Sequence, residues 1–102
     1  MSEFSQSFCI DSTHPSLAGH FPGNPIVPGV VLLDYARTLL QQWRPGGRIS
    51  SLSQCKFLKP LRPDQVFIIK LMQVSPTLIK FELECADEKL LAGAFIVEGA
   101  HD

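Results

Sequence analysis

Two titratable side chains in the first third of the sequence have the chemistry of a general acid–base pair. His20 precedes a segment rich in proline and glycine, and Asp34 follows that segment within a run of apolar residues. A histidine titrates near neutral pH, so it can accept a proton from a substrate. A carboxylate among apolar neighbours is a functional candidate, because its charge is costly to bury unless it is paired.

Each of these side chains also has a plain structural interpretation. His20 could hydrogen-bond the loop backbone and do nothing else, and its position alone favours this interpretation. Asp34 could lie on an exposed stripe of its helix together with Arg37 and Gln41, which follow it by three and seven residues. Spacing alone does not decide between the two interpretations of Asp34.

The backbone at Gly29 is a third candidate. Pro28 and Gly29 come just before the apolar run, where a helix is expected to begin. A glycine there leaves the first backbone N–H groups accessible, and these donors, with the helix dipole, favour a partial negative charge such as a polarised carbonyl oxygen. The same Pro-Gly pair is equally suited to a simple turn into a helix.

A stiff loop and one helix must position these groups. Residues 12–29 contain four prolines and three glycines, and so many residues that interrupt helices and strands predict a loop. The fixed φ angles of the prolines remove chain entropy and hold nearby side chains in place. A helix is predicted from residue 28 or 29 to residue 43 or 44. Its first half is apolar on all sides, which predicts that protein surrounds it on most sides. Helical spacing joins Leu33, Ala36, Leu40 and Trp43.

The remaining segments predict β-strands. Strands are expected over residues 5–11, 49–58, 65–74, 77–86 and 90–97, with a turn at 59–64. Successive strands joined by short turns pair antiparallel, and the single helix must pack on one face of their sheet. We therefore expect an α+β fold with one helix wrapped by a curved antiparallel sheet, in a single domain over residues 1–102. In the strand at 77–86, one face collects Ile79, Phe81, Leu83 and Cys85.

The segment between the two titratable residues carries a long ordered motif. It is His20-Phe21-Pro22-Gly23-x-Pro25-x-x-Pro28-Gly29, followed by an acid at position 34. This motif resembles the signature of the 3-hydroxyacyl-[acyl-carrier-protein] dehydratases of bacterial fatty acid synthesis. The segment Phe57 to Asp64 resembles that family's later strand and turn, (K/R)-F-x-(K/R)-P-x-x-P-G-D, and the similarity runs from about Ser12 to Val97. The resemblance implies a hot-dog fold, which agrees with the element order expected above.

The resemblance also implies a reaction and its residues. The family removes water from a 3-hydroxyacyl thioester to give a trans-2-enoyl thioester, in fatty acid or specialised polyene or lipid biosynthesis. His20 falls on the catalytic histidine, Asp34 on the catalytic acid, and Gly29 on the amide that contacts the thioester carbonyl. The family needs no metal and no organic cofactor, and its substrate arrives on acyl-carrier protein. Its histidine and acid come from different subunits, which implies a site at the interface of a dimer or higher oligomer.

Three features depart from the family pattern. Asp34 stands where the short Z-type enzymes usually carry glutamate, whereas aspartate is typical of the A-type enzymes that also isomerise the double bond. The chain is shorter than most members at its N-terminus. Pro63 is followed directly by Asp64, without the usual glycine between them.

Two rival functions remain open. A hot-dog thioesterase would use a carboxylate to activate water and would not need a histidine at position 20. A non-catalytic subunit could instead complete a heterodimer with a longer dehydratase, although the retention of both His20 and Asp34 argues against a wholly inactive partner.

Composition excludes several other classes. The formal net charge is -1, with no basic arm, so no nucleic-acid partner is expected. The apolar run at 26–33 is far shorter than the roughly 20 residues that span a bilayer. The three cysteines are odd in number and widely spaced, and the N-terminus does not have the pattern of a signal peptide, so a reduced, cytoplasmic location is expected. A metal site is not expected, because its candidates lack a standard spacing. Those candidates are Cys9, His14, His20 and Asp34.

Basic residues gather around one turn and beyond the helix. They could form a docking surface for an acidic carrier protein, or simply a solvated face, which is the slightly favoured interpretation. They are Lys56, Lys59 and Arg62, with Arg44 and Arg48.

Overall fold

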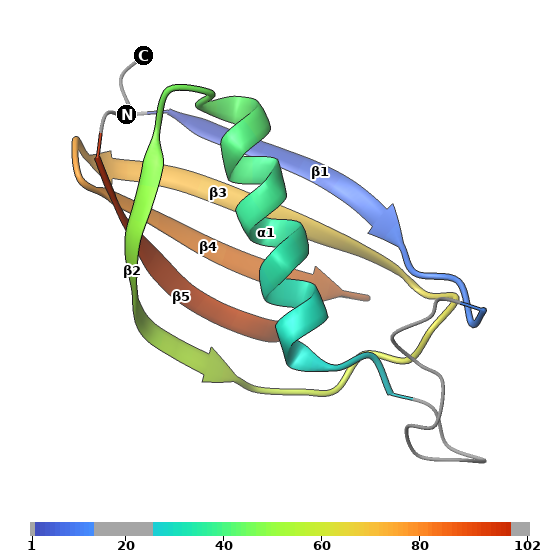
Figure 1. The fold of residues 1–102 in the computed structure, drawn as a ribbon. Helices are drawn as coiled ribbons and strands as arrows, with labels where there is room; N and C mark the ends of the chain where they lie inside the picture. Colours follow the sequence, from blue (N-terminus) through green and yellow to red (C-terminus); the bar gives the residue numbers. More distant parts are fainter. Residues whose placement is uncertain (1, 14–25, 99–102) are drawn as a thin grey trace.

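The computed structural model describes residues 2–13 and 26–98 of the 102-residue chain. One helix and five strands follow the order expected from the sequence (Figure 1). Among the described residues, no helix is long and apolar enough to cross a membrane. The elements are β1 (Glu3–Cys9), α1 (Gly29–Trp43), β2 (Arg48–Phe57), β3 (Val66–Ser75), β4 (Leu78–Cys85) and β5 (Glu88–Glu98).

The five strands form one antiparallel sheet in the order β1-β3-β4-β5-β2. The expected pairing of successive strands holds for β3, β4 and β5 but is wrong for β2 and β3, which lie apart in the sheet. The connection over residues 58–65 contains two prolines and runs past the start of the helix instead of turning tightly. Leu61, expected in a surface turn, is buried there, and the backbone N–H of Val27 donates to its carbonyl at 2.8 Å.

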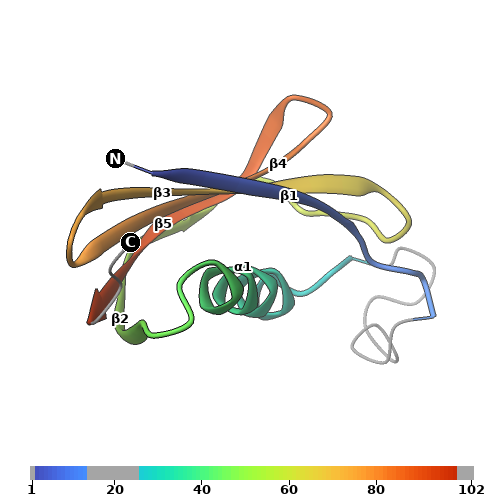
Figure 2. The same ribbon diagram turned by 90° about the horizontal axis from the view of Figure 1, so that it is seen from above.

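The helix packs in the concave face of the curved sheet (Figure 2). Its buried stripe is Leu32, Ala36, Leu39 and Leu40, whereas the predicted stripe members Leu33 and Trp43 are only half-buried. The stripe meets the inward side chains of the central strands, which alternate with exposed ones. The sequence predicted this alternation for residues 77–86. These inward side chains include Phe67, Ile69, Leu71, Ile79, Phe81 and Leu83. The arrangement is the expected α+β hot-dog fold.

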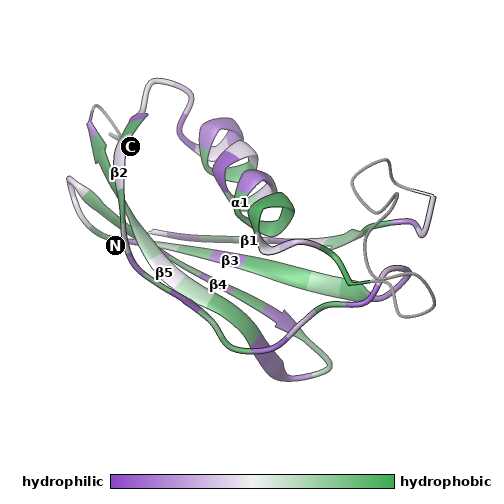
Figure 3. Cartoon of the chain, turned by 60° about the horizontal axis from the view of Figure 1, so that its bottom comes forward, coloured by the Kyte–Doolittle hydropathy of each residue, from purple (hydrophilic) through white to green (hydrophobic). Residues whose placement is uncertain are grey.

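The first turns of α1 are less enclosed than the sequence predicted. Figure 3 shows apolar colour on these turns, yet Val30 is 70% exposed. The sheet covers only one side of α1, and within the described residues no element covers the other side (Figure 2). The apolar surround that the sequence predicts for this part of the helix is therefore absent from the described part of the chain.

A β-bulge bends the edge strand β2. Its pairing with β5 shifts between Ser53 and Lys56, so that Gln54 and Cys55 together oppose Gly93. Gln54 has a φ of 53°, a left-handed conformation that such bulges accommodate. Gly93 is required because a Cβ atom there would lie 2.7 Å from Cζ of Phe81 and 3.0 Å from Cα of Cys55.

We expect Gly93→Ala to destabilise the chain by about 1–3 kcal/mol, because the added methyl group meets a packed ring and a backbone atom. Urea unfolding monitored by circular dichroism measures this change. Ser51→Ala, an exposed position on the neighbouring strand β2, is the control and should stay within about 0.5 kcal/mol of wild type. Equal stability of the two variants would contradict the close packing at Gly93.

Candidate functional site

The predicted histidine cannot be compared with the structure. His20 and most of the proline-rich loop, residues 14–25, lie outside the described residues. Its proximity to Asp34 and its role therefore stay predictions from the sequence. Gly29 and Asp34, which follow the loop, are both described.

Gly29 is the first residue of α1, and its backbone has donors to offer. Pro28 is the N-cap and makes no side-chain cap hydrogen bond. The N–H groups of Val31 and Leu32 donate to the carbonyl of Pro28, at 3.0 and 3.4 Å. Within the described residues, the N–H groups of Gly29 and Val30 have no acceptor. These two amides and the helix dipole can bind an oxygen that carries negative charge.

A second requirement for glycine at position 29 was not foreseen from the sequence. The ring of Phe57, on β2, lies so close that a Cβ atom on residue 29 would be 2.2 Å from Cε1 and 2.9 Å from Cζ. Only a residue without a side chain fits beside the ring as it stands. Gly29 belongs to the first motif that resembles the dehydratases, and Phe57 belongs to the second. The presence of both motifs in one chain was the signal that could have predicted this contact.

Asp34 lies on the exposed side of α1. Its side chain is 61% exposed and accepts a hydrogen bond from Nη2 of Arg37 at 2.6 Å. Gln41 is exposed as well. Of the two interpretations of Asp34, the exposed stripe shared with Arg37 and Gln41 is the one that the structure shows. The carboxylate points away from the core and is open to another molecule.

Exposed apolar side chains lie on the first turn of α1 and along the edge strand β2 to the residue that follows it. We call Val30, Leu52, Phe57 and Leu58 the edge patch. Phe57 is 60% exposed and Leu58 53%, and the contact between Phe57 and Gly29 joins the β2 members of the patch to the helix. Exposed groups of large apolar side chains mark surfaces that bind partners or ligands.

The predicted basic surface is largely engaged in local contacts. Lys59 pairs with Glu88, and Arg48 pairs with Glu98 at 2.8 Å. Nε of Arg44 donates to Gln73 at 3.0 Å, and its guanidinium lies 3.9 Å from the centre of the Trp43 ring. Because neighbouring groups already satisfy three of the five cations, the structure favours a solvated face.

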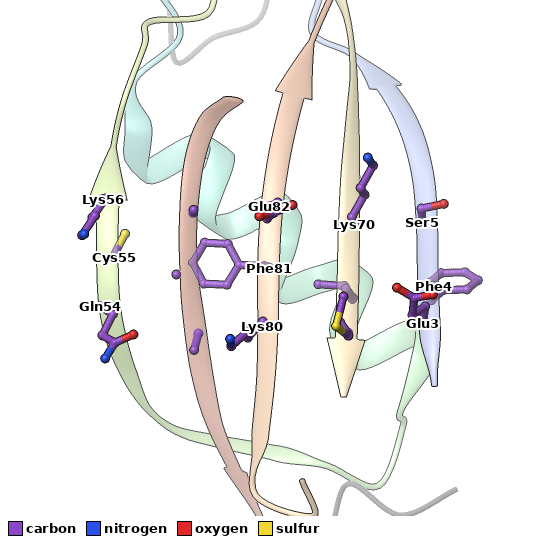
Figure 4. A pocket seen from close by; sticks show the side chains of 15 residues that line it. Glu3, Phe4, Ser5, Gln54, Cys55, Lys56, Lys70, Lys80, Phe81 and Glu82 are labelled. Atoms are coloured by element: carbon purple, nitrogen blue, oxygen red, sulfur yellow. The ribbon is translucent and has the colours of Figure 1, made fainter. Parts of the chain in front are cut away.

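A broad hollow lies away from these residues. It has a volume of about 1060 Å³ and lies on the face of the sheet opposite α1. In Figure 4, this face is toward the viewer and α1 lies behind the strands. Small side chains of β5, Ala92 and Ala94, line it beside Lys56, Lys70 and Lys80. Neither Gly29 nor Asp34 borders this hollow. Among the described residues, no group of three His, Cys, Asp or Glu side chains is placed to hold a metal ion.

Comparison with known proteins identifies the class. A family profile described as ApeI-like, for the ApeI dehydratase, matches residues 2–94. The chain therefore belongs to the ApeI-like dehydratase family, within the hot-dog dehydratases.

Relatives support this membership. The 3-hydroxyacyl-[acyl-carrier-protein] dehydratase FabZ of Syntrophobacter fumaroxidans is 37% identical over 67 residues, which cover 56% of this chain and 45% of that protein. FabZ of Caulobacter vibrioides is 29% identical over 86 residues, covering 72% of this chain and 54% of that protein. The chain thus spans about half the length of the curated relatives it matches.

Solved structures agree on the fold. A chain of the dehydratase heterocomplex ApeI:P from Xenorhabdus doucetiae superposes with a TM-score of 0.84 at 28% identity, covering 93% of this chain and 86% of that one. An acyl-CoA hydrolase mutant from Staphylococcus aureus gives a TM-score of 0.72 at 10% identity, covering 98% of this chain and 67% of that one. The hydrolase likeness shows a shared fold alone.

Replacement of Asp34 should leave stability almost unchanged. Exposed ion pairs contribute about 0.2–1 kcal/mol, so Asp34→Asn should lower the free energy of unfolding by no more than that. Leu39→Ala, on the buried stripe of the same helix, should cost about 2–5 kcal/mol. Denaturant titration of both variants measures the difference. A cost for Asp34→Asn as large as that for Leu39→Ala would mean that the carboxylate is buried.

The three cysteines are free thiols, and they differ in exposure. Cys9 is exposed, whereas burial raises the pKa of the Cys55 thiol. Since the thiolate is the reactive form, a raised pKa leaves less of it at neutral pH.

We expect brief treatment with iodoacetamide at neutral pH to label Cys9 well before Cys55, as followed by peptide mass spectrometry. The labelling of Cys55 should accelerate as the pH rises toward its elevated pKa. In denaturant the two rates should converge. Equally fast labelling of both thiols in the folded chain would contradict the burial of Cys55.

Proposed function

We propose that this chain removes water from a 3-hydroxyacyl thioester carried on acyl-carrier protein and forms a trans-2-enoyl thioester. The observation that carries this proposal is the match to the ApeI-like dehydratase family over residues 2–94. The FabZ relatives, named for the same reaction class, add support to it.

Three groups divide the chemistry in this proposal. The N–H of Gly29 holds the thioester oxygen and stabilises the negative charge that develops when the C2 proton leaves. His20, as a neutral imidazole, accepts that proton. Asp34 assists departure of the 3-hydroxyl group, directly or through a water molecule, and the imidazolium of His20 supplies the proton that converts the hydroxyl to water. The C2–C3 double bond forms as the C3–O bond breaks, so no metal or organic cofactor is needed.

A second subunit completes the site in this proposal. The exposed carboxylate of Asp34 and the edge patch lie on the uncovered side of α1 and at the adjoining β2 edge. Two copies, or this chain and a related hot-dog chain, would cover these groups and bring together the histidine of one subunit and the acid of the other. The similar Xenorhabdus chain comes from a dehydratase heterocomplex, which supports a heterodimer as the second candidate arrangement.

Turnover of 3-hydroxyacyl-acyl-carrier-protein substrates by the purified chain tests the proposal. We expect enoyl product from wild type, detected by mass spectrometry, and a loss of about 10²–10⁴-fold in rate for His20→Ala, because a positioned general base contributes that much. Asp34→Asn should also lose activity while keeping its fold, since its ion pair is exposed.

The control for this assay is Val66→Ala, an exposed change on the sheet face opposite the helix, which should retain wild-type turnover. Free acid in place of enoyl product would instead identify a thioesterase. Product only after addition of a second hot-dog chain would assign the heterodimer. No product under either condition would contradict the dehydratase proposal.

A further inference from the structure

Phe57 is unusual among the aromatic side chains that the structure describes. The rings of Phe67, Phe81 and Phe95 are at most 4% exposed, whereas Phe57 is 60% exposed. An exposed ring of this size leaves apolar area in water that a partner or ligand can cover, at about 25 cal/mol per Å². The exposed area of the Phe57 ring is therefore available for binding a partner or a ligand.

The strand fixes the position of the Phe57 ring. After the bulge at Gln54 and Cys55, β2 returns to regular pairing, with Phe57 opposite Leu91. Leu91 is buried on the helix side of the sheet, so Phe57 also faces the helix. The N–H of Leu58 donates to the carbonyl of Leu90 at 2.8 Å and ties down the next residue. A side chain on such a paired segment forms a firmer wall than one on a free loop.

That wall stands beside the proposed thioester site. Atoms of the ring lie 2.2 to 2.9 Å from the place that a Cβ atom of residue 29 would occupy, so the ring touches the backbone of Gly29. If the Gly29 amide binds the carbonyl oxygen of an acyl thioester, then C2, the carbon bonded to the carbonyl carbon, lies within reach of the same ring. Outside the chain neighbours of Gly29, the three heavy atoms nearest to that place all belong to the Phe57 ring.

We propose that Phe57 is a specificity-determining residue that excludes acyl groups branched at C2. This inference rests on the proposed function and names the substrate class of that site, 3-hydroxyacyl thioesters unbranched at C2. A methyl group on C2 would have to share the space that the ring occupies. Truncation of the ring removes that conflict.

The test compares 3-hydroxybutyryl with 2-methyl-3-hydroxybutyryl acyl-carrier protein as substrates of the full chain in its native assembly. The variants are Phe57→Ala and Phe57→Leu, of which the second keeps an apolar side chain if the first fails to fold. Val66→Ala is the matched control, since Val66 is 62% exposed and lies on the sheet face opposite the helix. In parallel, calorimetry measures binding of amide analogues of both acyl groups, whose C2 proton is much less acidic than that of a thioester.

We expect Phe57→Ala to raise the kcat/KM ratio of methylated to unmethylated substrate by about tenfold, because one methyl group in a pocket discriminates by at least that much. Phe57→Leu should give a smaller rise, and Val66→Ala should give none. The ratio of dissociation constants for the two analogues should shift in the same direction.

The outcomes separate this inference from the proposed function. An unchanged ratio in the variants, with wild type active, overturns the role of Phe57 and leaves the dehydratase proposal intact. Analogue binding whose preference depends on Phe57, without any turnover, overturns the dehydratase proposal and keeps Phe57 as the wall of an acyl site. Absence of both turnover and analogue binding overturns both.

Discussion

The burial of one apolar helix stripe in the concave face of one sheet underlies every other feature of this chain. Leu32, Leu39 and Leu40 are at most 3% exposed, and each contributes about 1.5–3 kcal/mol when fully buried. That packing fixes the axis of α1 and the direction in which its first turn points. The positions of Gly29 and Asp34 follow from it, because both are carried by the same helix.

The same packing leaves half of the helix open. A single sheet can cover only one side of α1, so Val30 and Asp34 remain exposed. Phe57, at the end of the edge strand β2, and the following residue Leu58 add to the uncovered surface. A small chain buries a modest share of its surface, and association is a common way for such chains to bury more. The exposed apolar residues beside a helix N-terminus fit a site that is completed by a second molecule.

Gly29 combines two physical requirements at one position. Its amide lies in the first turn of the helix, where backbone donors have no partner within the helix. Its missing side chain admits the Phe57 ring from a strand that follows much later in the sequence. A donor for an oxygen and a wall for the carbon beside it therefore meet at the same residue.

Much of the local structure could be predicted from the sequence, because it depends on short-range periodicity. The helix was expected from residue 28 or 29 to 43 or 44 and covers Gly29–Trp43, and alternation identified the buried face of β4. The roles of His20, Gly29 and Asp34 came from a resemblance to a family and not from these patterns. They stay proposals.

The tertiary structure decided what local patterns do not contain. Periodicity does not say which strand pairs with which, so the adjacency expected for β2 and β3 was wrong and β2 lies beside β5. Spacing left Asp34 between a buried and an exposed interpretation, and the exposed one holds because the sheet packs against the opposite side of the helix. The contact of Phe57 with Gly29 exists only once the bulged edge strand has folded back along the helix, since distant residues meet through packing and not through sequence spacing.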